Sequence, residues 1–201
     1  MTWRLVKLLA GLVLFGVGSW LGLQAELGVG PWDVLAGGLA QNLGRPFGQT
    51  AIGISVVVLA IGLACRVRPG IGTVLNVVVI GLVIDALLGT TALDDLGNRA
   101  LALRLTVTFA GILCVAAGSA LYLGAHLGPG PRDGLMVALV QRTGWPVGVC
   151  RALLELSVLV VGVALGGPVG VGTIAFALGI GPAMQLAFTV LRQTPARAVP
   201  A

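Results

Sequence analysis

Two copies of one short motif hold the residues whose types and spacing could best do chemistry. The motif is G-x-G-P-x-D, and it covers residues 28–33 and again residues 128–133. Proline suits the first position of a helix, and an acid in the first turn lies near the positive end of the helix dipole. Asp33 and Asp133 are therefore ordinary helix-start residues or, if the two helix starts meet inside a membrane, the ligands of a solute or a coupling ion.

The two copies of the motif differ in charge. Trp32 in the first copy is replaced by Arg132 in the second, and Glu26, just before the first copy, is replaced by His126. One half of the chain therefore offers an acidic and aromatic surface where the other half offers a basic one. Duplication alone explains why the motif occurs twice, whereas this difference favours a functional interpretation.

Two further charged residues lie inside a long apolar run. Arg151 and Glu155 are four positions apart, so on a helix they share one face and can form an ion pair. Ionisable residues inside a membrane are costly and usually face the interior of the bundle. The two residues are either a self-neutralised pair or part of a polar pathway. The complete predicted pathway for a substrate or ion consists of Asp33, Asp133, Trp32, Arg132, Gln41, Gln141, Arg151 and Glu155.

The sequence lacks the common signatures of catalysis and of metal or cofactor binding. It contains no H-x-x-x-H pair, no G-x-S-x-G elbow and no Walker loop. It has one histidine and three cysteines, and the cysteines show no CxxC spacing. We therefore predict that the protein is not an enzyme and holds no cofactor and no metal ion.

The composition shows which class of protein carries these residues. The chain has 201 residues, of which 57% are hydrophobic and only 9% are charged. A soluble domain has about 25% charged residues, and a disordered chain needs low hydrophobicity with high charge, so both classes are excluded. The mean hydropathy is +1.05. The net charge of +5 comes from basic residues at the ends of apolar runs, where they indicate topology, so we expect no nucleic-acid partner.

The elements that must position the motif are apolar runs about as long as a bilayer is thick. About 20 apolar residues cross the hydrocarbon core as a helix. Two shorter segments, 32–43 and 132–143, begin at the motif and end at Gly44 and Gly144, as expected for short helices that start at proline and stop at glycine. These segments are either re-entrant or lie at the membrane interface. The six predicted spans are residues 5–23, 51–65, 71–89, 101–123, 147–165 and 169–191.

The chain repeats itself at a spacing of 100 residues without a gap. Besides the motif, the matches include Gly18-Ser19 with Gly118-Ser119, Gln41 with Gln141, and Gly70-Ile71-Gly72-Thr73 with Gly170-Val171-Gly172-Thr173. Each half therefore holds three spans and one short helix. Because three is an odd number, the second half enters the membrane from the opposite side.

We therefore predict an all-α polytopic membrane helix bundle. Its six transmembrane helices form a 3+3 inverted repeat, with a short half-helix in each repeat. The predicted parts are a first membrane repeat (residues 1–92), an extracytoplasmic linker (93–100), a second membrane repeat (101–191) and a cytoplasmic tail (192–201).

The placement of charges predicts the orientation. With the N-terminus in the cytoplasm, eight basic residues lie inside, and three lie outside together with Asp94 and Asp95. The positive-inside rule favours this arrangement and opposes the reverse one. We expect a multi-pass protein of the bacterial plasma membrane with both termini in the cytoplasm and the lipid bilayer as its surroundings.

Small residues recur at helical spacing in two of the predicted spans. Gly18 and Gly22 are four apart, and Ala116, Ala120 and Gly124 continue the pattern in the matching span. Small residues let helix backbones approach closely. This pattern predicts close packing within the chain or, alternatively, an interface through which the protein forms a homo-oligomer.

Three motifs together resemble one known family. They are G-x-G-P-W-D at residues 28–33, Gly-x-Pro-Phe-Gly at residues 44–48 and Pro-Gly-Ile-Gly-Thr at residues 69–73. The sequence looks like the YczE/YyaS/YitT family of bacterial integral membrane proteins over residues 5–190, although the second copy departs from the pattern at Arg132. The resemblance implies a multi-pass protein of the bacterial plasma membrane and supplies no catalytic or binding residues.

Two functions fit these observations. The inverted duplication, the short segments interrupted by glycine and proline, and the few buried charges favour a permease for a small molecule or an ion, by analogy of architecture. The alternative is a membrane-embedded accessory or regulatory protein without transport activity. The absence of large soluble loops that a partner could bind favours transport.

Overall fold

The computed structural model describes residues 1–193, and all regular structure in this range is helical. Pro31 and Pro131 start the two short helices, and Gly44 and Gly144, both with left-handed backbone, end them, as expected from their positions in the sequence. The helices are α1 (Thr2–Ala25), α2 (Pro31–Leu43), α3 (Phe47–Ala64), α4 (Ile71–Leu88), the short 3-10 helix η1 (Leu96–Asn98), α5 (Leu101–Leu123), α6 (Pro131–Thr143), α7 (Val147–Ala164) and α8 (Val171–Val190). The predicted all-α polytopic membrane bundle is confirmed.

Five helices of the described chain are long and apolar enough to cross a membrane, namely α1, α3, α4, α5 and α8. They coincide with five of the six predicted spans, and the remaining predicted span is α7, a helix of 18 residues. α2 and α6 have 13 residues each, which gives a length of about 20 Å at about 1.5 Å per residue and is too short to span. Six crossings with inversion of the second half remain a prediction that this helix arrangement permits.

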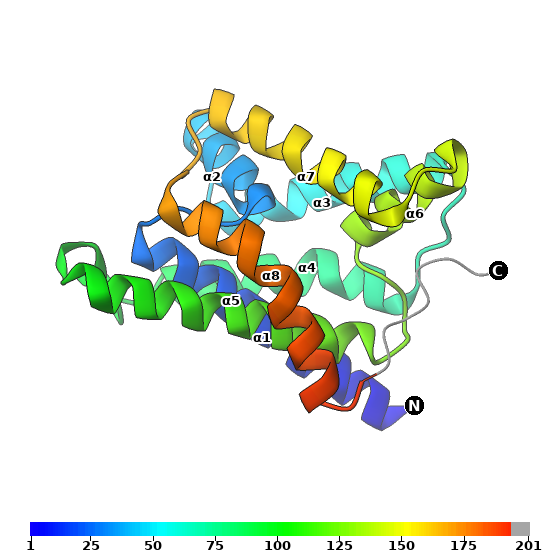
Figure 1. Ribbon diagram of the computed structural model, residues 1–201, viewed down its shortest axis with the longest axis horizontal. Coiled ribbons are helices and arrows are strands. Elements are labelled where there is room, and N and C mark those ends of the chain that lie inside the picture. The colour runs from blue at the N-terminus through cyan, green and yellow to red at the C-terminus, as the bar shows by residue number, and fades with distance from the viewer. Residues whose placement is uncertain (194–201) are drawn as a thin grey trace.

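α1 and α5 form the centre of the fold as an antiparallel pair (Figure 1). A Cβ atom added to Gly11 would lie 2.6 Å from the backbone nitrogen of Tyr122, and one added to Gly18 would lie 2.6 Å from the carbonyl oxygen of Gly111. Ala116 and Ala120 are also buried in the same region of α5. Gly18, Ala116 and Ala120 are therefore used for packing within the chain.

The two halves contact each other reciprocally. Arg4 donates from Nε to the carbonyl oxygen of Ala125 over 2.7 Å, and its counterpart Arg104 donates to that of Ala25 over 2.8 Å. α4 packs on α1 as α8 packs on α5, and α2 packs on α7 as α6 packs on α3. Such paired contacts are those of two like units that face each other across a two-fold axis.

The loops before the short helices also contact the opposite half in a reciprocal way. Gly72 donates its backbone N–H to the carbonyl oxygen of Leu127 over 2.8 Å, and Gly172 donates to that of Leu27 over 2.6 Å. Each loop therefore enters the motif while bound to the start of a long helix from the other half. These contacts fix the positions at which α2 and α6 begin.

The loops and the chain ends lie at two opposite ends of the bundle. The starts of α1 and the ends of α5 and α8 lie at one end, where Arg4 binds Ala125 and Gly124 lies next to Gln193 (Figure 1). The predicted linker, residues 93–100, lies at the other end, where Gly97 packs on Glu26 and Leu96 is buried. Residues 194–201, which form most of the predicted tail, lie outside the described residues.

The similarity of the two halves breaks down at one helix pair. α3 packs along α4, whereas the equivalent helices α7 and α8 do not pack along each other. Asp85 on α4 accepts the backbone N–H of Gly48 over 2.6 Å and that of Gln49 over 3.0 Å, and so caps the start of α3. Figure 1 shows α7 and α8 joined at one end and spreading apart toward the end where α1 begins.

Candidate functional site

A cavity of about 130 Å³ lies between the two halves of the chain. Its walls come from all eight α-helices, and the first turns of α2 and α6 contribute the motif residues. The polar side chains on its walls are Ser19, Trp32, Asp33, Ser55, Asn76, Ser119, Tyr122, Arg132, Asp133, Arg151 and Glu155.

Matching positions of the two halves line this cavity. They are Phe15 with Val115, Ser19 with Ser119, Gly30 with Gly130, Trp32 with Arg132, Asp33 with Asp133, Ala51 with Arg151, Ser55 with Glu155, Asn76 with Phe176, Ile80 with Ile180, and Ile84 with Met184. The cavity therefore lies where the two halves meet, and each half contributes the same wall segments with different side chains. This is the place where carriers built from repeats bind their substrates.

The starts of α2 and α6 meet across the cavity. The guanidinium carbon of Arg132 lies 4.8 Å from the centre of the Trp32 ring, a cation–π contact between the two copies of the motif. Asp33 and Asp133 line the same cavity. The two short helices therefore do not lie apart at opposite surfaces, and both helix dipoles direct their positive ends toward one place.

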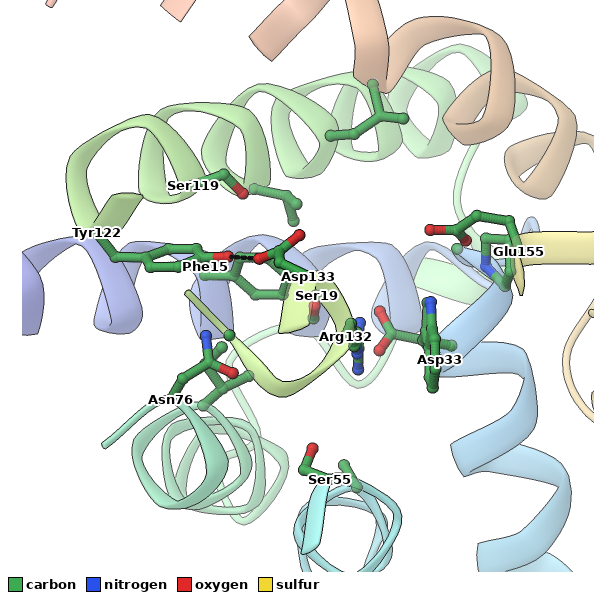
Figure 2. A pocket seen from close by; sticks show the side chains of 18 of the residues that line it. Phe15, Ser19, Asp33, Ser55, Asn76, Ser119, Tyr122, Arg132, Asp133 and Glu155 are labelled. Carbon is green, nitrogen blue, oxygen red and sulfur yellow. Dashed lines mark hydrogen bonds between the residues drawn. The ribbon is translucent and has the colours of Figure 1, made fainter. Parts of the chain in front are cut away.

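The two motif carboxylates differ in their surroundings (Figure 2). The Tyr122 hydroxyl donates to Oδ2 of Asp133 over 2.7 Å. Asp33 is only 7% exposed, and the buried Ser19 hydroxyl beside it can donate to its carboxylate. No described group donates a hydrogen bond to Oγ of Ser19. Buried polar groups are normally satisfied, so this pair marks a place that a ligand can complete.

Charges of both signs line the cavity without closing into ion pairs. Three carboxylates, those of Asp33, Asp133 and Glu155, face two guanidinium groups, those of Arg132 and Arg151. Within the described chain the one ion pair shorter than 4.0 Å is Arg99 with Asp95, far from the cavity in the linker. Arg151 and Glu155 therefore share the cavity as the pathway interpretation requires, but their charged ends do not meet.

Two predicted site residues lie elsewhere. Gln41 and Gln141 are exposed near the ends of α2 and α6, and neither lines the cavity. Their repetition reflects the shared helix, because the motif that forms the site is at the other end of each short helix. The other six predicted pathway residues all line the cavity.

Five polar residues of the cavity were not among the predicted site residues: Ser19, Ser55, Asn76, Ser119 and Tyr122. Ser19 and Ser119 were visible in the sequence as part of the repeated Gly-Ser pair, which served only to establish the repeat. Tyr122 follows Ser119 by three positions, so the two share a face of α5. The presence of a second polar residue one turn from the repeated serine was the signal that could have revealed it.

Comparison with known proteins agrees with this picture of a membrane protein. An uncharacterized protein of Haemophilus influenzae is 39% identical over 94% of this chain and 84% of its own length. The uncharacterized membrane protein YczE of Bacillus subtilis is 35% identical over 84% of this chain and 78% of its own. The uncharacterized protein YyaS of the same organism is 25% identical over 82% of each chain.

No solved structure is significantly similar to this fold. The relatives and the five apolar helices together establish a membrane protein, and the predicted resemblance to YczE and YyaS is confirmed. One family model covers nearly the whole chain, from residue 2 to residue 189, and so includes both motif copies and every wall of the cavity. The chain belongs to the family of unknown function DUF6198.

Proposed function

We propose that this protein is a carrier that moves a small solute across the bacterial plasma membrane by alternating access. The observation that carries the proposal is a polar cavity between two like halves whose two sides are unequally closed. A carrier of this kind exposes one central site first to one side of the membrane and then to the other.

The antiparallel pairing of α1 and α5 supports the inverted arrangement. Gly11 packs on Gly118 and Gly18 packs on Gly111, so the two equivalent helices run in opposite directions. If α1 crosses the bilayer outward, α5 crosses it inward, and the two-fold axis lies in the membrane plane. The positive-inside rule then puts both termini in the cytoplasm.

The first half closes one side of the cavity. Gly48 on α3 and Gly81 on α4 are both buried, and a Cβ added to Gly81 would lie 2.6 Å from the carbonyl oxygen of Gly48. Asp85 holds the start of α3 in this position. Ala51 and Ile84, which line the cavity next to this contact, are buried as well.

The second half leaves the opposite side open. The equivalent residues Gly148, Arg151 and Gly181 are all exposed. No atom lies within 4 Å of a Cβ added to Gly148 or Gly181. In the proposed cycle the halves exchange conformations, so that α7 closes on α8 through these two glycines while α3 leaves α4. Pro182, inside α8, removes a helix hydrogen bond beside this contact and allows α8 to bend.

A disulfide trap tests the cycle. The variant carries Gly148→Cys and Gly181→Cys in a chain whose native cysteines are replaced by serine. A disulfide needs Cα atoms about 4.4–6.8 Å apart, so it forms only when α7 closes on α8. Oxidation of the variant in proteoliposomes is expected to stop solute uptake, and reduction is expected to restore it. In the control, Gly148→Cys is combined with Gly179→Cys, because Gly179 faces α5 near Ile112, and no disulfide should form.

The assay of transport uses radiolabelled propylammonium, alanine and propionate in proteoliposomes, with empty liposomes as the control. Uptake above the control that is lost in Asp33→Asn is the expected result. If the folded wild-type protein moves none of these solutes, or if the oxidised trap transports as fast as the reduced one, the carrier proposal is wrong. The accessory or regulatory interpretation then takes its place.

A further inference from the structure

We infer that the cavity binds a small primary ammonium compound, with its positive group held by Asp33 and Ser19. The inference rests on the proposed function, because it names the class of solute that the carrier would move. It assigns unequal roles to the two motif acids: Asp33 binds the solute, and Asp133 is a structural partner of Tyr122.

The first argument comes from the unsatisfied acceptors. Asp33 and Ser19 are 7% and 4% exposed, and both line the cavity. No described group donates a hydrogen bond to Oγ of Ser19. A primary ammonium group carries three donors and no acceptor, so it can donate to the carboxylate and to the hydroxyl at once. At the second copy of the motif, Tyr122 already donates to Asp133 over 2.7 Å. The Asp133 carboxylate therefore has less capacity to accept hydrogen bonds from a solute.

The second argument comes from the balance of charge. Three carboxylates and two guanidinium groups line the walls, so one negative charge is in excess when all are ionised. Arg132, on the opposing motif, lies beside Asp33 and over the Trp32 ring (Figure 2), so it compensates one of the three carboxylates. Charges inside a membrane are costly unless they are compensated. A bound monovalent cation compensates the excess, whereas a bound anion increases the imbalance on the side of Asp33.

The third argument comes from size and from the apolar walls. A volume of about 130 Å³ is roughly ten times the 10–15 Å³ that a single water needs, so it admits a solute of several heavy atoms. Phe15, Phe176 and the Trp32 ring form apolar walls of the same cavity. Such walls suit a short alkyl group attached to the ammonium and disfavour a hydrated metal ion.

The test is isothermal titration calorimetry with the full chain purified in detergent. The probes are propylammonium, tetramethylammonium, sodium ion and propionate. Propylammonium is expected to bind, while tetramethylammonium, which has no N–H donor, and sodium ion are expected to bind at least about tenfold more weakly. Equal binding of sodium ion, or tighter binding of propionate, would overturn the assignment to an amine.

Substitutions localise the site. Asp33→Asn is expected to weaken propylammonium binding about 10- to 100-fold, and Ser19→Ala about 3- to 10-fold, as for loss of a charged and of a neutral hydrogen-bond acceptor. The matched comparison is Ser119→Ala, the equivalent buried serine on the other side of the same cavity, which should weaken binding less than Ser19→Ala does. A larger effect of Ser119→Ala than of Ser19→Ala would show that the site lies at Asp133. Unchanged melting temperatures show that the variants are folded.

Arg151 distinguishes a simple amine from an amino acid. Its side chain is exposed at the open side of the cavity. Arg151→Gln should tighten propylammonium binding, because it removes a repelling charge. If alanine binds more tightly than propylammonium and loses that advantage in Arg151→Gln, the solute is a zwitterion, and the assignment to a simple amine that carries one net positive charge is wrong. Because calorimetry needs no transport, an amine that binds without being moved in proteoliposomes contradicts the carrier proposal and leaves the site standing.

Discussion

At the scale of single residues, the cavity separates side chains that build the fold from side chains left free to bind. Tyr122 is 5% exposed and uses its hydroxyl to satisfy Asp133. Arg132 is stacked on Trp32. Asp33 and Ser19 are about as buried as Tyr122, at 7% and 4% exposed, but no described group donates a hydrogen bond to Oγ of Ser19. Burial alone therefore does not define the site, and unsatisfied hydrogen-bonding capacity does.

Removal of the Tyr122 hydroxyl should leave Asp133 without its donor. Tyr122→Phe is expected to destabilise the protein by about 1.5–3 kcal/mol, the range for a buried hydrogen bond to a charged group. In a double-mutant cycle with Asp133→Asn, most of this loss should disappear, because the amide no longer carries the charge. The measurement is thermal unfolding in detergent. Additive losses in the double variant would show that the hydroxyl and the carboxylate act independently.

Asp85 should stabilise the start of α3 from a neighbouring helix. Its carboxylate accepts two backbone N–H groups at 2.6 and 3.0 Å, which is the role of an N-cap supplied by another element. Asp85→Ala should therefore cost about 1–2 kcal/mol in thermal unfolding. The matched control is Gln185→Ala, at the equivalent position of α8 where the side chain is exposed, and it should change stability by less than about 0.5 kcal/mol.

At the scale of elements, the close packing of α1 on α5 sets the distance between the helices that pack on them. Gly18→Ala places a Cβ 2.6 Å from the carbonyl oxygen of Gly111, and backbone cannot move aside as a side chain can. A loss of about 1–3 kcal/mol is expected from this overpacking, measured as a lower melting temperature. Gly53→Ala on α3 is the control, because its Cβ meets no atom within 4 Å. If both variants melt alike, the helices do not pack as closely as described.

Many helix boundaries could be predicted from the sequence, because the residues that start and end a helix lie at the boundary itself. Pro31 and Gly44 mark the two ends of α2 directly. Because the repeat has a spacing of 100 residues, Pro131 and Gly144 mark the ends of α6 in the same way. The sequence left open whether Asp33 and Asp133 meet or lie at opposite surfaces, and the structure places both on one cavity. The role of Tyr122 did not follow from the sequence, because it depends on the rotation of α5 against α6, which is set by tertiary packing.

At the scale of the whole molecule, the two halves match at many positions in the sequence, but their helices do not pack in the same way. Gly48 and Gly148 occupy equivalent positions in the repeat, yet one is buried against Gly81 and the other is exposed. A repeat in the sequence predicts two equivalent contacts but cannot predict which of them is closed. The two contacts also differ in side chains outside the matched glycines, since Asp85 caps the start of α3 and the equivalent residue of α8 is Gln185. The separation of α7 from α8 was therefore beyond the reach of sequence analysis.

The orientation of the molecule gives the last prediction. Asp95 lies in the linker at one end of the bundle, whereas Arg4 and Ala125 lie together at the other end. The positive-inside rule places the linker outside and the start of α1 in the cytoplasm. In a chain whose native cysteines have been replaced, the variant Asp95→Cys should therefore react with a membrane-impermeant maleimide on intact cells.

The matched control for this labelling is Trp145→Cys. Trp145 is 49% exposed, and it precedes α7, whose start lies at the same end of the bundle as the start of α1 (Figure 1). This cysteine should react only after the cells are made permeable, and the open side of the cavity then faces the cytoplasm. The reverse labelling pattern would show the opposite orientation in the membrane, with the open side of the cavity facing outward. Labelling of both cysteines on intact cells would contradict the six-span arrangement, because the two ends of the bundle would then lie on the same side of the membrane.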